Sequence, residues 1–407
     1  MRARCFVALA LAATWTVCAG VARADVITVW NAQVVTSAGP MSQRTFAMVS
    51  LAMFDAVNGI EGGYRPYLEH PDAPAGASPK AAAAAAARGV LVRLFPAQQA
   101  SLDALLASSI ADVPDGGAKV AGLAYGDLVG EGVYTARLTD NMLAPGPLFV
   151  DGTAPGQYRL TTPGPPQPVN TGASTWQPFA LRSASQFRPG PPPALSSFVY
   201  ARDLALTKAW GGSTSTLRTP ELDEIARWHT EQAQFQFNRI ARAELENDGR
   251  GLLTHARLFA LLNMALADAT TAVFDAKYTY RFWRPVTAIH LADSDGNRLT
   301  EADPSWTPFL TTPPHPEYPA AHGAVQGAGA AVLTWYLGPR HAFTTTSPTV
   351  PGVTRAYQSV AQFAVEGAAA RILGGMHFLR ALEVGSMQGQ QVAAWVLAKQ
   401  LPPVKRR

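Results

Sequence analysis

The chain has 407 residues, of which 48% are hydrophobic and 15% are charged, so it can bury a large core and does not have the composition of a disordered segment. Its formal net charge of +4 falls to +1 when the three arginines of the first 24 residues are left out. A nearly neutral chain gives no support for nucleic-acid binding.

The first 24 residues have the pattern of a secretory signal peptide. A basic start is followed by an apolar run from Phe6 to Val17 and by Ala22-Arg23-Ala24, a small-x-small cleavage signal. Both cysteines, Cys5 and Cys18, fall inside this segment, so the rest of the chain has no thiol for a disulfide, a metal or a nucleophile. We expect an exported protein, periplasmic or secreted; the alternative is a retained membrane anchor.

Helical periodicity dominates residues 25–140, and strand-like alternation is scarce. The alanine-rich stretch from Pro79 to Leu94 is a strong local helix former. We therefore expect an N-terminal helical half over residues 25–140. Its predicted helices cover residues 44–58, 79–94, 97–110 and 118–138.

Residues 141–193 are crowded with Pro, Gly, Ser and Thr. An irregular segment of this length is typical of a lid, an excursion packed over the core, or a strap between two domains. We favour a strap between two helical halves. Trp176 and Phe179 are expected to pack down onto the core rather than to line an entrance.

Helices resume in residues 194–407, the expected C-terminal half. Thr219 and Pro220 have the pattern of an N-cap followed by proline at the first helical position. The predicted helices cover residues 196–209, 219–247, 252–280, 320–337, 353–373 and 377–400. The sequence thus predicts an all-α fold with a bundle-like core. The best candidate for a later membrane span, residues 320–337, contains His322 and several glycines, and we interpret it as a buried helix.

Lys277 and Arg284 are seven residues apart, and Pro285 indicates that the helix ends between them. Both cations could then bend toward one pocket. The structural alternative is a surface lysine and an arginine lying over aromatic side chains.

Pro319-Ala320-Ala321-His322 has the pattern of a helix start, where the free amides of the first turn bind anions. Arg371 and His377 flank two glycines, which break a helix and allow close approach of the backbone. A tetrahedral oxyanion needs positive charge, amides and a basic atom able to reach its centre, and these segments supply all three. Packed histidines and a structural arginine are the alternatives for each segment alone.

Together, Lys277, Arg284-Pro285, Pro319-x-x-His322, and Arg371 with His377 resemble the signature of the vanadium-dependent haloperoxidases and the related type 2 phosphatidic acid phosphatase superfamily. That signature has Lys and Arg seven apart, then Pro-Ser-Gly-His, then Arg and His six apart. Further similarity to bacterial, haloperoxidase-like members covers most of the chain after the leader.

The resemblance implies a role for each residue. Lys277, Arg284 and Arg371 would bind the equatorial oxygens of vanadate, for which phosphate competes. His377 would be the axial vanadium ligand, or the phosphorylated histidine of a phosphatase. His322 would be the acid/base.

Three further positions bear on the resemblance. Ala320 and Ala321 replace the serine and glycine of the oxyanion-binding motif, and the resemblance implies that both positions bind the oxyanion. The hydroxyl donor is lost at Ala320, and the Ala321 amide remains. His315 resembles the residue found in bromide-oxidising rather than chloride-oxidising members. An aspartate often follows the last histidine by four residues; here that position is Ala381, Glu383 is the nearest acid, and the residue that would orient a histidine is not identified.

The resemblance implies an exported haloperoxidase that uses hydrogen peroxide, halide (bromide favoured) and a small organic acceptor. A soluble acid phosphatase acting on phosphate monoesters through a phosphohistidine is the first alternative. A catalytically weak oxyanion-binding protein is the second. A zinc hydrolase using His315, Glu317 and His322 is the third.

Overall fold

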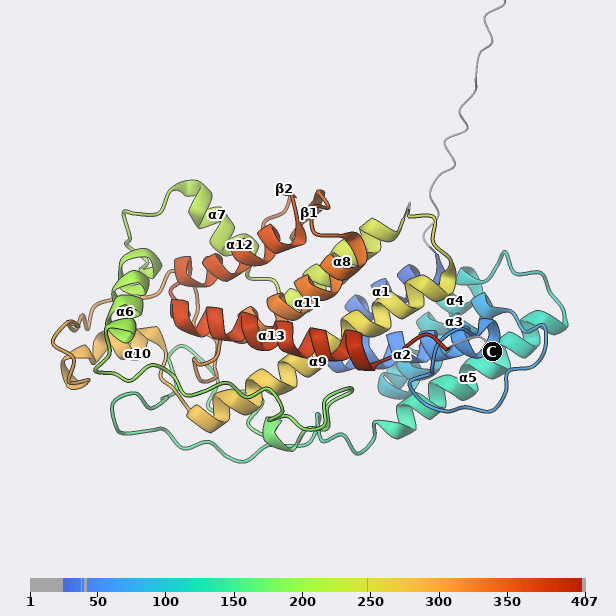
Figure 1. The fold of residues 1–407 in the computed structure, drawn as a ribbon, viewed down its shortest axis with the longest axis horizontal. Coiled ribbons are helices and arrows are strands. Elements are labelled where there is room, and N and C mark those ends of the chain that lie inside the picture. The colour runs from blue at the N-terminus through green and yellow to red at the C-terminus, as the bar shows by residue number, and fades with distance from the viewer. Residues whose placement is uncertain (1–24, 38, 40–41, 247, 405–407) are drawn as a thin grey trace, which may run out of the picture.

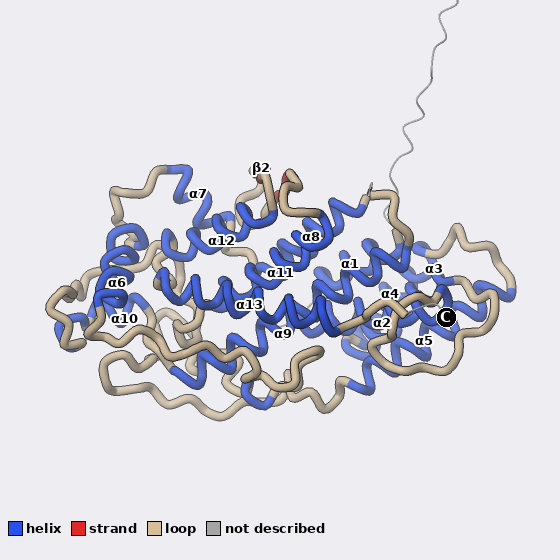
Figure 2. Tube along the Cα trace, in the orientation of Figure 1, coloured by secondary structure: helices blue, strands red, loops and turns tan. Residues whose placement is uncertain are grey.

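The computed structural model describes residues 25–37, 39, 42–246 and 248–404. The expected leader, with Cys5 and Cys18, lies outside these residues. Within them the protein has thirteen α-helices and one two-stranded sheet, so the predicted all-α fold class is confirmed (Figure 1, Figure 2).

The first five helices form the N-terminal part of the molecule, on the right in Figure 1. They are α1 (Val26–Ser37), α2 (Ser42–Glu61), α3 (Pro79–Leu94), α4 (Gln99–Ser109) and α5 (Gly117–Ala136). The last four were predicted, and α1 was not, because its β-branched residues favour strands. Asp25 supports α1 by accepting a hydrogen bond of 2.8 Å from the Thr28 amide.

Eight helices make up the rest of the fold. They are α6 (Phe198–Gly211), α7 (Pro220–Trp228), α8 (Ala233–Leu245), α9 (Leu252–Tyr280), α10 (Pro285–His290), α11 (Ala321–Leu337), α12 (Val360–Leu373) and α13 (Leu379–Lys399). The short helix α10 was not predicted.

Two predicted helices differ from the structure. The helix expected over 219–247 is broken into α7 and α8, because the Thr230 hydroxyl donates to the Arg227 carbonyl at 2.6 Å and the chain leaves the helical path at Gln232. The helix expected over 353–373 begins only at Val360, capped by Ser359. The residues before it form strand β2 (Thr354–Tyr357), which pairs antiparallel with β1 (Phe343–Thr346).

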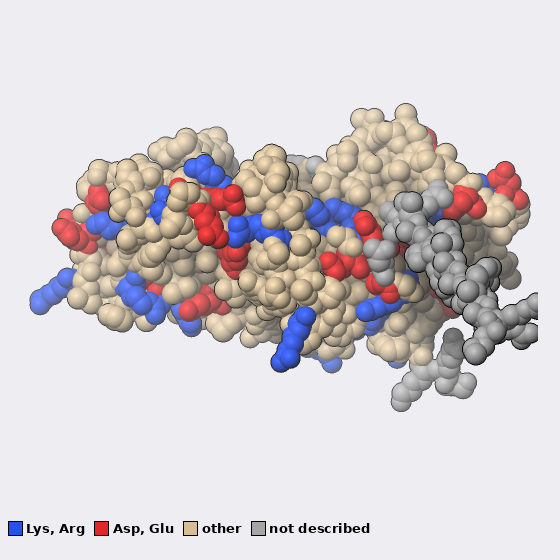
Figure 3. Space-filling model, turned by 90° about the horizontal axis from the view of Figure 1, so that it is seen from above, with Lys and Arg blue, Asp and Glu red and all other residues tan. Residues whose placement is uncertain are grey.

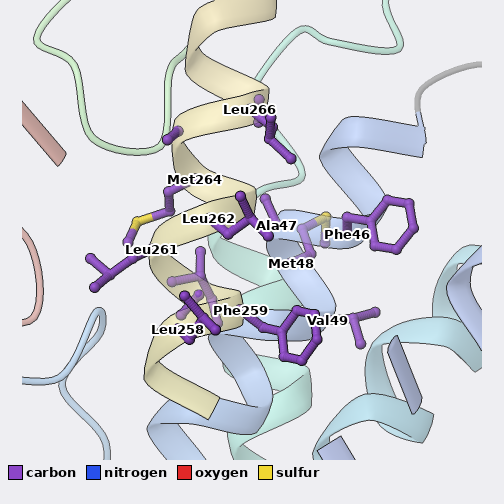
Figure 4. Close-up of a cluster of buried hydrophobic side chains, with 14 of the residues drawn as sticks. Phe46, Ala47, Met48, Val49, Leu258, Phe259, Leu261, Leu262, Met264 and Leu266 are labelled. Atoms are coloured by element: carbon purple, nitrogen blue, oxygen red, sulfur yellow. The ribbon is translucent and has the colours of Figure 1, made fainter. Parts of the chain in front are cut away.

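The long helix α9 is the centre of the core. Its apolar side chains pack against α2, where Phe259 and Leu262 point toward the earlier helix, while Leu261 and Met264 lie on the opposite side of α9 (Figure 4). One continuous buried cluster extends from Val26 to Leu401, so helices of both predicted halves share it. The chain end also returns to the N-terminal part, where the Val404 amide donates to the Gly63 carbonyl at 2.8 Å.

Helices α11 and α13 approach closely through glycines spaced four apart. A Cβ at Gly385 or Gly389 of α13 would lie 2.4 Å or 1.9 Å from a carbonyl oxygen of α11, at Ala320 and Ala324 respectively. A Cβ at Gly327 of α11 would lie 2.3 Å from the Ser386 carbonyl oxygen of α13. This close packing places the start of α11, which carries Ala321 and His322, against the first turns of α13.

The irregular segment over 141–193 is held to α9 by two carboxylates seven residues apart, hence on one face of that helix. Asp268 accepts hydrogen bonds of 2.6–2.9 Å from three successive amides of residues 179–181. Asp275 forms a bidentate ion pair with Arg188. Trp176 and Phe179 are buried in the main core, which confirms that they pack down.

Among the described residues, only α9 is long and apolar enough to cross a membrane, and the qualifying stretch is wholly buried within the protein. The segment that the sequence offered as the best candidate, now α11, does not meet that test. On the face seen in Figure 3, acidic and basic side chains are interspersed between broad uncharged areas.

Candidate oxyanion site

The corner between α9 and α10 places the first two cations. Arg281 ends α9 in a left-handed conformation, with φ 48°, and its amide donates to the Lys277 carbonyl at 2.7 Å. Arg284 then caps α10, whose first residue is Pro285. The helix therefore ends between the two cations, as the sequence predicted, and both side chains are fully buried.

Arg284 joins two of the predicted site segments. Its Nη1 donates to the Met376 carbonyl at 2.9 Å and lies 3.2 Å from His377 Nε2. Its Nη2 lies 3.0 Å from His315 Nδ1, and its Nε donates to the His315 carbonyl at 2.7 Å. Lys277 donates to the carbonyls of Pro316 and Glu317 at 2.7 and 2.8 Å.

Arg371 comes from the last turn of α12. Its Nη1 lies 3.4 Å from the His229 carbonyl, its Nη2 lies 3.2 Å from the Met376 sulfur, and its Nε has no hydrogen-bond partner. Gly375, with φ +74°, turns the chain after α12 and packs against Gly211, where an added Cβ would lie 2.4 Å from the carbonyl oxygen. The turn brings Arg371 and His377 to the same cavity.

His377 is buried and held by an acid from the loop before α11. Its Nδ1 lies 2.9 Å from Glu317 Oε1, which also accepts the Phe378 amide at 3.0 Å. A guanidinium only donates, so the Nε2 of the neutral His377 accepts from Arg284. The proton is therefore assigned to Nδ1, and the lone pair of Nε2 faces Arg284. Glu383, the acid nearest to His377 in the sequence beyond it, instead pairs with Arg380 at the surface.

The start of α11 supplies the remaining predicted groups. His322 is half-buried, and its Nε2 lies 3.3 Å from the Gln326 side-chain nitrogen. The Ala320 amide donates to the Ala381 carbonyl at 2.9 Å, so that position cannot offer it to an anion, contrary to the sequence expectation. Ala321 lines the cavity, and amides of a first helical turn have no acceptor within the helix.

A cavity of about 410 Å³ brings together His315, Ala321, His322, Arg371 and His377. Lys277, Arg284 and Ala320 do not line it. Arg284 lies behind its wall, where it contacts both His315 and His377.

The other cavity-lining residues come from several elements that no sequence motif marked. They are Gln43, Val169, Asn170, Thr230, Gln232, Ala233, Gln234, Thr270, Phe274, Pro313 and Val325. Val169 and Asn170 show that the irregular segment reaches the cavity wall.

Burial and repulsion between like charges shift the pKa values of the ionisable side chains in the site. Burial lowers the pKa of Lys277 well below its usual value, with a further contribution from Arg284, and burial lowers the pKa of Arg284 and of Arg371 to about 10. Burial and the three cations lower the pKa of His377, which favours its neutral form. Burial raises the pKa of Glu317 to about 7, although Lys277 opposes this.

The charge around the cavity is suited to an anion. Among the residues that the structure describes, none of Lys277, Arg284 and Arg371 forms an ion pair with a carboxylate. Glu317 is the buried acid that interacts with Lys277 and Arg284, so one acid faces three cations. Such an excess of buried positive charge is costly and favours an anion that balances it. The unpartnered Nε of Arg371, the His377 lone pair and the first-turn amides fit a tetrahedral oxyanion such as vanadate or phosphate.

Comparison with known proteins agrees with this chemistry. The family described as "VCPO second helical-bundle domain" matches residues 257–404, which include all the site segments. A bacterial vanadium-dependent iodoperoxidase structure superposes with a TM-score of 0.77 and 26% identity, covering 94% of this chain and 96% of that one. This chain is thus similar to vanadium-dependent haloperoxidases, in its fold and in the residues of the matched family.

Two further similar proteins are less identical in sequence or align over a shorter stretch. The vanadium chloroperoxidase of Curvularia inaequalis is 31% identical over 111 residues, and the match spans only 17% of that protein and 25% of this chain. A holo-type bacterial vanadium-dependent chloroperoxidase has a TM-score of 0.69 at 19% identity, covering 91% of this chain and 92% of that one, which shows the shared fold.

The role of Glu317 in the site was not predicted from the sequence. Glu317 was considered only as a zinc ligand with His315 and His322, but its carboxylate instead holds His377. No group of three metal-binding His, Cys, Asp or Glu side chains occurs among the described residues. In the sequence, Glu317 is an isolated acid between two prolines, close to His315 and His322. That pattern marks a residue near the site, but it does not indicate His377, 60 residues later, as its partner.

Proposed function

We propose that this chain is a vanadium-dependent haloperoxidase that oxidises halide with hydrogen peroxide. The observation that supports this most is that His377 and the buried Arg371 line one cavity, while the buried Arg284 lies 3.2 Å from His377 Nε2. The buried Lys277 adds a third cation, bound to the carbonyls of Pro316 and Glu317. The iodoperoxidase and chloroperoxidase assignments of the similar structures add to it.

The residues present would hold vanadate in a defined way. His377 would donate its Nε2 lone pair, and Arg371, Arg284 and Lys277 would balance the negative oxygens. Vanadate, when bound, supplies a Lewis-acidic centre that activates hydrogen peroxide for oxygen transfer to halide. The net reaction consumes one halide, one hydrogen peroxide and one proton, and yields a hypohalous acid and water.

His322 is the proposed acid/base. Burial lowers its pKa well below the usual value, with further contributions from the charges of Arg371 and His229, so the imidazole is neutral and can accept a proton at neutral pH. It lines the cavity near Ala321, and Gln326 contacts its Nε2. A cavity-facing imidazole with this protonation state can take a proton from incoming hydrogen peroxide.

A second candidate is an acid phosphatase. The same cations fit a phosphate ester, and the neutral His377, with its lone pair at Nε2, has the form of a nucleophile. We rank this function second because the superimposable structures are haloperoxidases.

Two assays on one purified protein separate the candidates. Bromination of monochlorodimedone with vanadate and peroxide is expected, with little hydrolysis of p-nitrophenyl phosphate in vanadate-free buffer. Hydrolysis alone would reverse the ranking, and oxyanion binding with neither activity would indicate a binding protein. His377→Ala is expected to abolish the activity while appreciable anion binding remains, and a fully active variant would remove His377 from its role.

Halide preference and export are further parts of the proposal. We place bromide first because of His315, whose ring Nδ1 lies 3.0 Å from Arg284 Nη2. Initial rates with iodide, bromide and chloride would test this, and a chloride rate equal to the bromide rate would contradict it. Export is tested by sequencing the N-terminus of protein recovered outside the cytoplasm, where Asp25 is expected first.

A further inference from the structure

Glu317 is a fully buried acid with no part in the chemistry described above. Its backbone is tied to the corner between α9 and α10. Its amide donates to the Phe282 carbonyl at 2.9 Å, and its carbonyl accepts from Lys277 Nζ at 2.8 Å. The position of its side chain is therefore set by the same corner that places Lys277 and Arg284.

Its carboxylate connects that corner to the turn between α12 and α13. Oε1 accepts from both the Nδ1 of His377 and the amide of Phe378, at 2.9 and 3.0 Å. The two donors, His377 and Phe378, are adjacent in the chain, so the two hydrogen bonds restrain both the imidazole and the backbone next to it. Glu317 thus contacts residues of both the α9–α10 corner and the α12–α13 turn, and it lies only five residues before His322.

Nearby acids are engaged elsewhere. Asp203 accepts from the Arg380 amide at 2.7 Å and pairs with Arg202, while Glu383 pairs with Arg380. The second oxygen of Glu317, Oε2, has no partner and is buried beside a small cavity lined in part by Ala381. Within the described residues, Glu317 is the carboxylate that meets His377.

We propose that Glu317 is the positioning residue of His377, fixing its proton on Nδ1, aiming Nε2 into the oxyanion site and strengthening Nε2 as an electron-pair donor. A carboxylate at the far nitrogen of an imidazole fixes its tautomer and ring orientation and raises its ligand basicity. The effect on vanadate binding rests on the proposed function. The contact between Glu317 and His377 is given by the hydrogen bonds alone.

Three variants separate charge from hydrogen bonding. Glu317→Gln keeps an acceptor of nearly the same shape and removes the charge. Glu317→Ala removes both. Glu383→Gln, at the surface, is the matched control because it removes an acid six residues from His377 that does not contact the imidazole.

The first readout is the tautomer of His377 in vanadate-free protein, measured by nitrogen NMR with labelled histidine and assigned by comparison with His377→Ala. The wild type and the control are expected to carry the proton on Nδ1 with the chemical shift of a nitrogen that donates to a carboxylate. Glu317→Gln is expected to weaken that hydrogen-bond shift and Glu317→Ala to lose it, even where Arg284 at Nε2 keeps the proton on Nδ1. A proton on Nε2 in the wild type, or an Nδ1 shift unchanged in Glu317→Ala, would overturn the inference.

The second readout is affinity for vanadate and for inorganic phosphate by calorimetry at one pH. Glu317→Gln is expected to lose about 10–100-fold in vanadate affinity, as is usual for outer-shell partners of a ligating histidine. Unchanged vanadate affinity in a folded Glu317→Gln protein would also overturn the proposed role of Glu317. A wild type that binds the anions but does not oxidise halide would contradict the proposed function instead, while these comparisons would still decide the role of Glu317.

Discussion

Arg371 Nη2 lies 3.2 Å from the sulfur of Met376, and a thioether is a weak acceptor for a guanidinium. The Nε of the same arginine has no partner, although the side chain is only 7% exposed. The folded protein therefore carries the desolvation cost of this cation without a strong local compensation.

Arg371→Met should separate stability from anion binding. We expect vanadate affinity to fall by about 2–5 kcal/mol, because the cation is desolvated against the anion. Thermal stability in anion-free buffer should be equal or higher, because an apolar side chain of similar length replaces an uncompensated charge. Calorimetry and melting curves with and without phosphate measure both effects.

The exposed Arg340 provides the control for this substitution. Arg340→Met should leave vanadate affinity and the stabilisation by phosphate unchanged. Equal affinity in wild type and Arg371→Met would show that Arg371 does not contact the anion.

Gly389→Ala should destabilise the protein by about 1–3 kcal/mol through overpacking. The new Cβ would lie 1.9 Å from the Ala324 carbonyl oxygen, so α13 would have to move from α11. Gly117→Ala at the start of α5 is the control, since its Cβ would meet nothing within 4 Å. Urea unfolding of both variants tests the close approach, and two equally stable variants would contradict it.

His255 forms a pH-dependent link between Asp25 and Asp248, which it contacts through its two ring nitrogens. Burial alone lowers the pKa of His255, but hydrogen bonds to the aspartates outweigh burial and raise that pKa above its usual 6.5. Burial likewise raises the pKa of each aspartate, yet hydrogen bonds leave both below the usual 3.8.

These pKa shifts make the free energy of unfolding depend on pH. The histidine contribution is full below pH 6.5 and is lost as pH rises through its raised pKa, whereas the aspartate contributions are lost as pH falls through their lowered values. His255→Gln should therefore lower the free energy of unfolding by about 1–3 kcal/mol near pH 5.5 and by less at pH 9, as measured by urea unfolding. A cost that increases with pH would contradict the link.

Asp268→Asn should loosen the irregular segment from α9. The variant keeps only one of two acceptor oxygens and loses the charge, so we expect a loss of about 2–3 kcal/mol in the free energy of unfolding. Hydrogen exchange should accelerate at the amides of residues 179–181 and remain slow in the middle of α9. Unchanged exchange at these amides would show that Asp268 does not secure the segment.

Local patterns in the sequence were sufficient for much of the helical framework. Pro79 after Ser78 and Pro220 after Thr219 mark helix starts that the structure confirms, because caps act within one turn. The same local reasoning missed the break at Thr230. Leaving a helix there depends on a side-chain hydrogen bond and on packing, and the apolar periodicity continues across the break.

The candidate site was likewise predicted only in part from the sequence. The spacing of ordered segments was enough to predict Lys277, Arg284, Arg371 and the two histidines as candidate site residues. Tertiary structure decided which of them line the cavity, that Glu317 holds His377, and that Arg371 lacks a carboxylate partner. Those relationships join residues far apart in the chain, and only the packing of helices around α9 sets the distances between them.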